Sequence, residues 1–344
     1  MRAGLITGIR QCEVTDVAEP TPVDGSAVVE IRLCGICGSD VHAYAEGWQY
    51  APQLCGHEWF GEVVATGAGV DSVRDGDLVM AGLGPGCGRC SYCAIGQVHY
   101  CRPANREYNG MGPHASPNGG FASLIGVDAD RLVVLPEDIT PVQGALVEPA
   151  AVAFHAIQQS GMRSGDTVAV LGAGPIGQLT AMCARLAGAA IVIVIEPDAE
   201  RRELSVQLGA DIGLDGGSET RSKVRELTAG RGVDVAFDAA GIPQTLEASI
   251  DLLRRGGTAC MVGVSGKPTE VMTNKWMTKE ITLTTSILYT KDEAHTVGQL
   301  IATGRLAATA LHQGTIGLDE LPGTVEQMAN REVNALKLLV DPTR

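Results

Sequence analysis

A glycine motif in the middle of the chain constrains the fold more than any other feature. Three glycines form the pattern G-x-G-x-x-G directly after the apolar run Thr167 to Leu171 and at the start of a helix-length segment. The first glycine permits a tight turn, the second lets the backbone approach a pyrophosphate, and the third lets helix and strand pack closely. The motif therefore predicts a dinucleotide site formed by Gly172, Gly174, Pro175, Ile176 and Gly177.

An acidic residue follows the next predicted strand. Ile191 to Ile195 ends at Glu196, nineteen residues after Gly177, where a carboxylate can accept hydrogen bonds from the ribose diol of the adenosine. A 2′-phosphate at that position would meet a like charge, so we expect NAD rather than NADP. Arg201 is a further cofactor-binding candidate that leaves this choice open. The alternative is a glycine-rich turn of an unrelated α/β protein, with a solvated glutamate.

The second half of the chain alternates apolar strands with helical segments. Buried parallel strands are predicted at Thr167 to Leu171, Ile191 to Ile195, Val233 to Phe237, Thr258 to Val262 and Ile281 to Thr285, with helices such as Ile176 to Ala187 and Ala199 to Leu208 between them. This alternation is typical of an α/β fold with a doubly wound parallel sheet.

The first 150 residues have a different pattern. Short apolar or alternating runs, separated by Gly, Pro and Asp turns, predict an antiparallel and partly closed β-domain with strands at Ala27 to Ile31, Gly61 to Ala65, Leu78 to Ala81 and Leu132 to Leu135. The tail from Glu293 predicts two helices and a last strand, Ala335 to Val340, which we expect to pack back on this β-domain.

Four cysteines indicate a closed metal site. Cys87, Cys90, Cys93 and Cys101 have the spacing C-x2-C-x2-C-x7-C within a glycine-rich loop. Four thiolates suit tetrahedral zinc with no position left for a substrate. We therefore expect a structural zinc that organises this loop.

A second set of residues has the chemistry of an open zinc site. Cys37 provides a thiolate and His57 an imidazole, and Glu148 is the candidate third ligand, since a catalytic zinc uses three protein ligands and one exchangeable position. Glu58 has three possible roles: it could bind the metal, displace water from it, or support another ligand. Each residue also has an ordinary structural interpretation, such as a buried thiol, a core histidine or a helix-capping glutamate.

Composition narrows the class of protein. The chain has 344 residues, 45% of them apolar, and a net charge of −14. Such acidity argues against a nucleic-acid partner, and no run has the length of a membrane span. The opening residues lack the apolar core of a secretory signal. Ten cysteines in such a chain are better explained by metal binding and free thiols than by disulfides, so we expect the reducing cytoplasm.

These motifs together resemble the zinc-dependent medium-chain dehydrogenase/reductase family. The resemblance rests on Cys37 to His42, on Gly56-His57-Glu58 and on the four-cysteine lobe and the glycine motif, in the family's order over essentially the full length. It implies a GroES-like β-rich catalytic domain at 1–150 and 288–344, a Rossmann domain at 151–287, and a homo-oligomer, dimer or tetramer. Glu148, in place of a second cysteine, resembles the sorbitol, butanediol and threonine dehydrogenase branch. Leu288 stands where sorbitol dehydrogenases tend to have an arginine, which argues against sorbitol itself.

The resemblance implies a reaction. NAD would take the hydride of a secondary alcohol, one of two zinc ions would lower the pKa of the alcohol, and Ser39 and His42 would pass the released proton to solvent. We expect a diol or polyol-like substrate. Two alternatives are a zinc-independent alkene or quinone reductase on the same scaffold, and an NAD-sensing binding module.

Overall fold

Two compact units make up the part of the chain that the computed structural model describes, residues 1–48, 50–84, 86–104, 116–266 and 268–344. The first unit comprises Met1–Glu148, Tyr289–Gly304 and Ala308–Arg344. The second comprises Pro149–Leu288 and Arg305–Ala307. In this described part, no helix combines the length and the apolar character that a membrane span needs.

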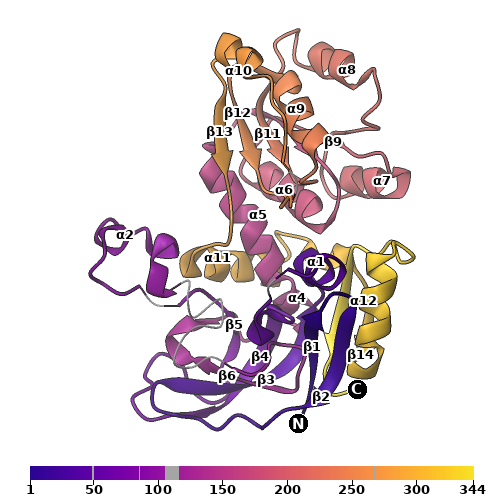
Figure 1. Cartoon of the computed structure of the whole chain (residues 1–344). Helices are drawn as coiled ribbons and strands as arrows, with labels where there is room; N and C mark the ends of the chain where they lie inside the picture. The colour runs from indigo at the N-terminus through magenta and orange to yellow at the C-terminus, as the bar shows by residue number, and fades with distance from the viewer. Residues whose placement is uncertain (49, 85, 105–115, 267) are drawn as a thin grey trace. The chain divides into compact units, whose positions relative to one another are not determined.

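The second unit is built on a parallel sheet of six strands in the order β10-β9-β8-β11-β12-β13 (Figure 1). The strands are β8 (Thr167–Leu171), β9 (Ile191–Ile195), β10 (Ile212–Leu214), β11 (Val233–Asp238), β12 (Leu253–Met261) and β13 (Thr282–Thr285). The strand order reverses between β8 and β11, which is where a doubly wound sheet binds its ligand. The predicted fold class is confirmed.

The sequence explains both the core and the helices of this unit. The strands are apolar on both faces, and residues such as Ala169, Ile193 and Ala236 form a common buried cluster with Ile250 of a covering helix. The helices are α5 (Val147–Ser160), α6 (Pro175–Leu186), α7 (Ala199–Gln207), α8 (Thr220–Leu227), α9 (Pro243–Leu252) and α10 (Thr273–Lys279). Proline begins both α6 and α9, where its missing N–H costs nothing.

The first unit is built on a seven-stranded sheet. Its order is β14-β15-β3-β4-β5-β7, and β6 also pairs with β3. The strands are β3 (Ser26–Gly35), β4 (Glu58–Thr66), β5 (Leu78–Ala81), β6 (Leu124–Asp128), β7 (Leu132–Val134), β14 (His312–Gly317) and β15 (Lys337–Asp341). All pairs are antiparallel except β14 with β15, which are parallel. The strands predicted within the first 150 residues thus pair in the antiparallel manner expected, and the parallel pair is formed by two strands of the tail.

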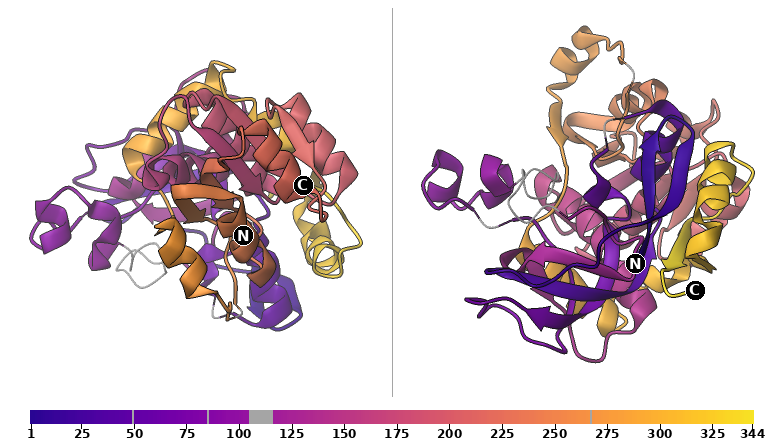
Figure 2. Two further views of the ribbon diagram at one scale, coloured as in Figure 1. Left: turned by 90° about the horizontal axis from the view of Figure 1, so that it is seen from above. Right: turned by 60° about the horizontal axis from the view of Figure 1, so that its bottom comes forward.

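Smaller elements complete the first unit. Among the residues that the structure describes they are the hairpin β1 (Arg2–Gly8) and β2 (Gln11–Asp16), the helices α1 (Gly38–Glu46), α4 (Pro141–Ala145), α11 (Lys291–Ala302) and α12 (Leu321–Ala329), and five short 3-10 helices. The four-cysteine loop carries α2 (Ser91–Ala94) and the turn Val98–Tyr100, and it projects from the sheet of its own unit (Figures 1 and 2).

Two strand pairings position the residues that the sequence analysis singled out. In the register of β3 with β4, Gly35 lies opposite Glu58 and Cys34 opposite Trp59. On the other side of β3, Leu339 of β15 pairs with the same Gly35. A strand from the tail is thus brought next to the beginning of β4.

Candidate functional site

Three predicted metal ligands meet at the start of β4. Cys37 is the N-cap residue of α1, and Glu58 is the first residue of β4, directly after His57. One ligand atom of each lies within 4.8 Å of the other two. The structure therefore brings a thiol, an imidazole and a carboxylate together, although Cys37 and His57 are twenty residues apart.

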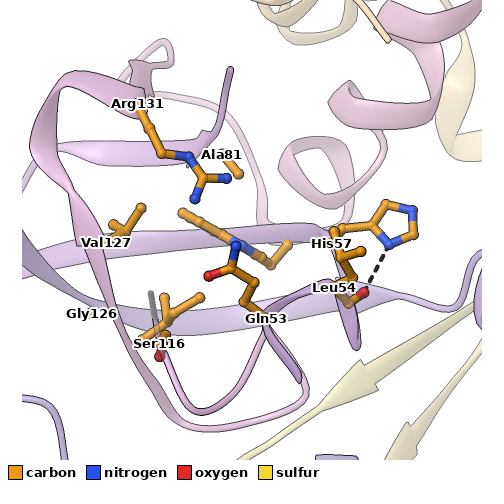
Figure 3. A pocket seen from close by; sticks show the side chains of 10 residues that line it. Gln53, Leu54, His57, Ala81, Ser116, Gly126, Val127 and Arg131 are labelled. Carbon is orange, nitrogen blue, oxygen red and sulfur yellow. Dashed lines mark hydrogen bonds between the residues drawn. The ribbon is translucent and has the colours of Figure 1, made fainter. Parts of the chain in front are cut away.

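The imidazole of His57 presents one nitrogen to this cluster. Its Nδ1 lies 3.0 Å from the carbonyl oxygen of Leu54, and a carbonyl can only accept, so Nδ1 carries the hydrogen. In the neutral ring, Nε2 then carries the lone pair that can bind a metal. His57 also lines a pocket, together with Gln53, Ser116 and Arg131 among others. Its imidazole ring points away from Arg131 (Figure 3). The ligand atoms therefore do not converge in that pocket.

A buried carboxylate organises the backbone around the cluster. Asp40 is fully buried, and it accepts hydrogen bonds from the N–H of Cys37 at 2.9 Å and of Gly56 at 3.3 Å. Tyr50 adds its hydroxyl at 2.9 Å. Burial raises the pKa of Asp40, while His57, the Cys37 N–H and Tyr50 act in the opposite direction. Asp40 thus fastens the two segments that supply ligands.

Glu58 forms a buried ion pair with Lys337 of β15. The ammonium lies 2.8 and 2.6 Å from the two carboxylate oxygens and donates a further hydrogen bond to the carbonyl oxygen of Ile36. Burial alone would lower the pKa of Lys337, but Glu58, Cys37 and Glu148 raise it above its usual value. The contact explains how a glutamate can be buried here, and it engages both oxygens of the carboxylate.

Glu148 is buried in the first turn of α5. It does not belong to the group of three within 4.8 Å. Burial raises its pKa to about 7, and the charges of Glu58 and Asp40 act in the same direction, whereas His57 and Lys337 lower it. A carboxylate in such surroundings is stabilised by an added positive charge.

The donor set fits zinc. A thiolate, a neutral imidazole and carboxylates are the usual ligands of a catalytic zinc ion, which binds three protein groups and keeps one position open. Three buried carboxylates, Asp40, Glu58 and Glu148, against the one lysine Lys337 also favour a divalent cation at this place.

The two predicted proton-relay residues both lie on α1 but have different partners. Ser39 Oγ lies 3.2 Å from the hydroxyl of Tyr50 and 3.5 Å from Nε2 of His57. His42 is half exposed, bonds to Glu46 at 3.1 Å and stacks on Trp48 with ring centroids 5.0 Å apart. Ser39 therefore faces the metal cluster, whereas His42 faces solvent.

The four-cysteine loop also brings its sulfurs together. The four Sγ atoms all lie within 4.8 Å of one another; they belong to Cys87, Cys90, Cys93 and Cys101. The backbone N–H of Arg89 is the main cause that lowers the pKa of Cys87 to about 6, so this thiol ionises readily. The set fits a closed zinc site of four thiolates.

The glycine loop of the second unit has the shape of a phosphate cradle. Gly172 has φ 95°, and a Cβ on Gly177 would lie 1.9 Å from the carbonyl oxygen of Gly172, so both positions require glycine. A Cβ on Gly174, by contrast, would meet no atom within 4 Å. Gly174 is the N-cap of α6, followed by Pro175 and Ile176. Open space at a helix N-terminus fits the pyrophosphate of a dinucleotide.

Glu196 lies at the end of β9, beside this loop. Its Oε2 accepts the N–H of Ala173 at 2.6 Å, and its Oε1 accepts the N–H of Asp198 at 3.0 Å. The carboxylate is buried rather than solvated. Arg201 follows in the first turn of α7, and its carbonyl oxygen accepts the side-chain amide of Gln178 from α6 at 2.9 Å.

Sequence reasoning missed several residues of the metal cluster. Lys337, Asp40, Gly35 and Tyr50 were not predicted to belong to the metal site. A lysine within the apolar run Leu336 to Val340 was the one available signal. Cys55, a thiol next to the site, is buried, accepts the N–H of Ile6, and has its pKa raised to about 12 by burial, so it has the properties of an inert core residue.

Comparison with protein families and known proteins gives matches along the chain. Residues 23–137 match the model described as alcohol dehydrogenase GroES-like domain, and residues 175–303 match the model described as zinc-binding dehydrogenase. The (R,R)-butanediol dehydrogenase of Bacillus subtilis strain 168 is 33% identical over 99% of this chain and 100% of its own. A sorbitol dehydrogenase of Halalkalibacterium halodurans is 34% identical over 78% of both chains.

Solved structures agree with these matches. A putative zinc-binding dehydrogenase from Sinorhizobium meliloti 1021, bound to NADP, superimposes with a TM-score of 0.88 at 31% identity and covers 99% of both chains. The GroES-like and Rossmann fold class is thereby confirmed. Neither a metal-independent reductase nor a binding module is favoured by these relatives.

Proposed function

The chain belongs to the zinc-dependent medium-chain dehydrogenase/reductase family and is an oxidoreductase acting on a CH–OH group, and on that premise we propose that it interconverts a small secondary alcohol of the diol or polyol class and its ketone. The observation that carries the proposal is the meeting of Cys37, His57 and Glu58 within 4.8 Å. A zinc ion held there would act as a Lewis acid and lower the pKa of the substrate hydroxyl.

Cys37, His57 and Glu148 are the proposed ligands of this zinc. Cys37 and His57 offer Sγ and Nε2. Glu58 is the alternative to Glu148, but Lys337 occupies both of its oxygens, which favours a supporting role. We propose a second, structural zinc on the four sulfurs of the cysteine loop.

NAD is the proposed cofactor, and when bound it accepts the hydride from the carbinol carbon. The glycine loop would hold the pyrophosphate with the N–H groups at the start of α6. Glu196 would accept hydrogen bonds from the adenosine ribose, and its charge would repel a 2′-phosphate. The related S. meliloti structure is bound to NADP, so a side-by-side assay with NAD and NADP tests this preference.

Ser39 and His42 are the proposed path for the substrate proton. Ser39 lies at the metal cluster and His42 at the surface, so the hydroxyl would take the proton and the imidazole would release it to water.

The proposed substrate class rests on Glu148 and on the named relatives, a butanediol and a sorbitol dehydrogenase. Tyr289, next to Leu288, is buried and donates its hydroxyl to the carbonyl oxygen of Ala81, so it acts as a packing anchor of the first unit.

A homo-oligomer is also proposed. β13 is the edge strand of the six-stranded sheet, and apolar side chains are exposed at Leu283 on this strand and at Met277 on α10. An exposed edge with apolar neighbours favours pairing with a second copy of the chain. None of the ten cysteines, all of which the structure describes, forms a disulfide, and the proposed zinc thiolates need a reducing compartment such as the cytoplasm.

A substrate panel tests the function. Vicinal diols, other secondary alcohols and primary alcohols are assayed with NAD and with NADP, before and after chelation. We expect oxidation of the diols with NAD, loss of activity with the chelator, and recovery with zinc. Activity with primary alcohols alone, or full activity after complete removal of metal, would overturn the proposal.

A further inference from the structure

The hydroxyl of Tyr50 connects three groups of the metal cluster. It lies 2.9 Å from Oδ1 of Asp40, 3.2 Å from Oγ of Ser39 and 3.2 Å from Nδ1 of His57. Tyr50 comes from the segment between α1 and β4, so it joins residues of the helix to the loop that carries His57. A phenol has a single hydrogen to donate, and its direction therefore constrains the other two bonds.

The hydrogens available on these groups set the direction of each hydrogen bond at the Tyr50 hydroxyl. Asp40 accepts backbone N–H groups on both oxygens, so it is an acceptor and Tyr50 donates to it. The hydrogen on Nδ1 of His57 goes to Leu54. With Nε2 of His57 engaged by the proposed zinc, that nitrogen no longer accepts from Ser39 Oγ at 3.5 Å. The oxygen of Tyr50 is then left as the acceptor for the hydroxyl of Ser39, which donates its own hydrogen.

We propose that Tyr50 is a positioning residue that holds Ser39 with its hydrogen turned to the phenol and its lone pairs toward the substrate. Ser39 then meets the alcohol as a hydrogen-bond acceptor, the polarity that a group must have to take a proton from it. As the substrate proton arrives, Ser39 releases its own hydrogen, which leaves toward His42 once the hydroxyl has turned from the phenol. In a phenylalanine variant the hydroxyl of Ser39 would lose this partner and rotate freely. The inference rests on the proposed alcohol oxidation.

Tyr50→Phe removes only the oxygen. We expect kcat for a secondary alcohol to fall at least about tenfold, the loss that corresponds to one hydrogen bond in the transition state, with little change in KM. Zinc content and the midpoint of zinc release to a chelator should stay unchanged, because Leu54 still holds Nδ1 of His57. Tyr44→Phe is the matched control: Tyr44 is a buried tyrosine of α1, and its variant should keep the wild-type kcat.

A double-mutant cycle separates positioning from other roles. If Tyr50 acts through Ser39, the variant Ser39→Ala/Tyr50→Phe loses no more activity than Ser39→Ala alone. Ser39→Thr, which keeps the hydroxyl, should remain sensitive to Tyr50→Phe. If the losses of kcat in the two single variants multiply in the double variant, the inference is wrong. It is also wrong if Tyr50→Phe loses zinc, because Tyr50 would then act by holding His57. If wild-type protein oxidises no alcohol, the proposed function itself fails.

Discussion

The ammonium group of Lys337 lies 2.8 and 2.6 Å from the two carboxylate oxygens of Glu58, and both side chains are almost completely buried. The pair joins β15 of the tail to the first residue of β4, beside the candidate metal ligand His57. An intact buried ion pair adds little to the net stability of a fold, because both charges must be removed from water. Removal of one partner is costly, because the other charge is then left unpaired in the interior.

We therefore expect Lys337→Met to destabilise the fold by about 3–5 kcal/mol. Denaturant unfolding measures the loss. The variant Glu58→Gln/Lys337→Met removes both charges and should recover most of it. Lys223, in an exposed pair with Glu219, is the matched control, and Lys223→Met should change stability by less than about 1 kcal/mol. Equal effects of the two lysine variants would contradict the role of the buried pair.

Gly35 makes the space for Glu58. A Cβ at this position would lie 2.1 Å from Oε2 of Glu58, so Gly35→Ala must displace the carboxylate from Lys337. We expect a loss of about 1–3 kcal/mol, as for other overpacked interiors, with weaker zinc retention on dialysis. Gly323→Ala meets no atom within 4 Å in α12 and should leave both quantities unchanged or slightly improved. Unaltered zinc retention in Gly35→Ala would show that Glu58 is dispensable for the metal.

Cys90→Ser tests the cysteine loop. We expect one zinc fewer per subunit by elemental analysis and a lower melting temperature or weaker assembly, because a structural zinc contributes directly to folding. Turnover per remaining zinc at the second site should change little. Cys183→Ala, a buried thiol of α6, is the control that keeps both metals. A normal melting temperature for Cys90→Ser would count against a structural zinc.

Glu196→Gln tests the cofactor preference. The amide keeps an oxygen for the N–H of Ala173 and removes the charge. We expect the ratio of kcat/KM for NAD over NADP to fall about tenfold, which corresponds to ~1.4 kcal/mol, mainly through better use of NADP. A ratio that stays constant would mean that Glu196 only braces the glycine loop.

Glu148 gives the metal-free protein a distinctive pH dependence. Its pKa in the fold is about 7, above its ordinary 4.5, so the folded state holds the proton more tightly than the unfolded chain. Burial of Glu148 therefore does not lower the free energy of unfolding below pH 4.5, where the group is protonated in both states. The free energy of unfolding falls as the pH rises to about 7. Thermal unfolding of chelator-treated protein from pH 4 to 8 should show this fall, and Glu148→Gln should lack it. Parallel curves for the two proteins would refute the assignment.

The sequence predicted the second unit well because its strands are continuous apolar runs. β8 and β9 have the predicted bounds because both are short apolar runs, β8 between Asp166 and Gly172 and β9 ending before Glu196. β10 and β14 were missed because each is interrupted by glycine, and β12 begins at Leu253, before the predicted Thr258.

The metal cluster was only partly predictable. Cys37 and His57 stand in local motifs that a sequence displays. Lys337 stands in an apolar strand and resembles an ordinary solvent-facing residue, because its partner Glu58 is 279 positions away. Such a pairing arises from the tertiary fold and leaves no short-range pattern.

That separation has a consequence for synthesis. After Glu58 leaves the ribosome, 279 further positions must be translated before Lys337 follows. During this interval the carboxylate has no counter-ion from the tail, and β3 has no neighbour in β15. The nascent chain therefore cannot complete this corner of the molecule early, and its maturation waits for a segment made near the end of translation.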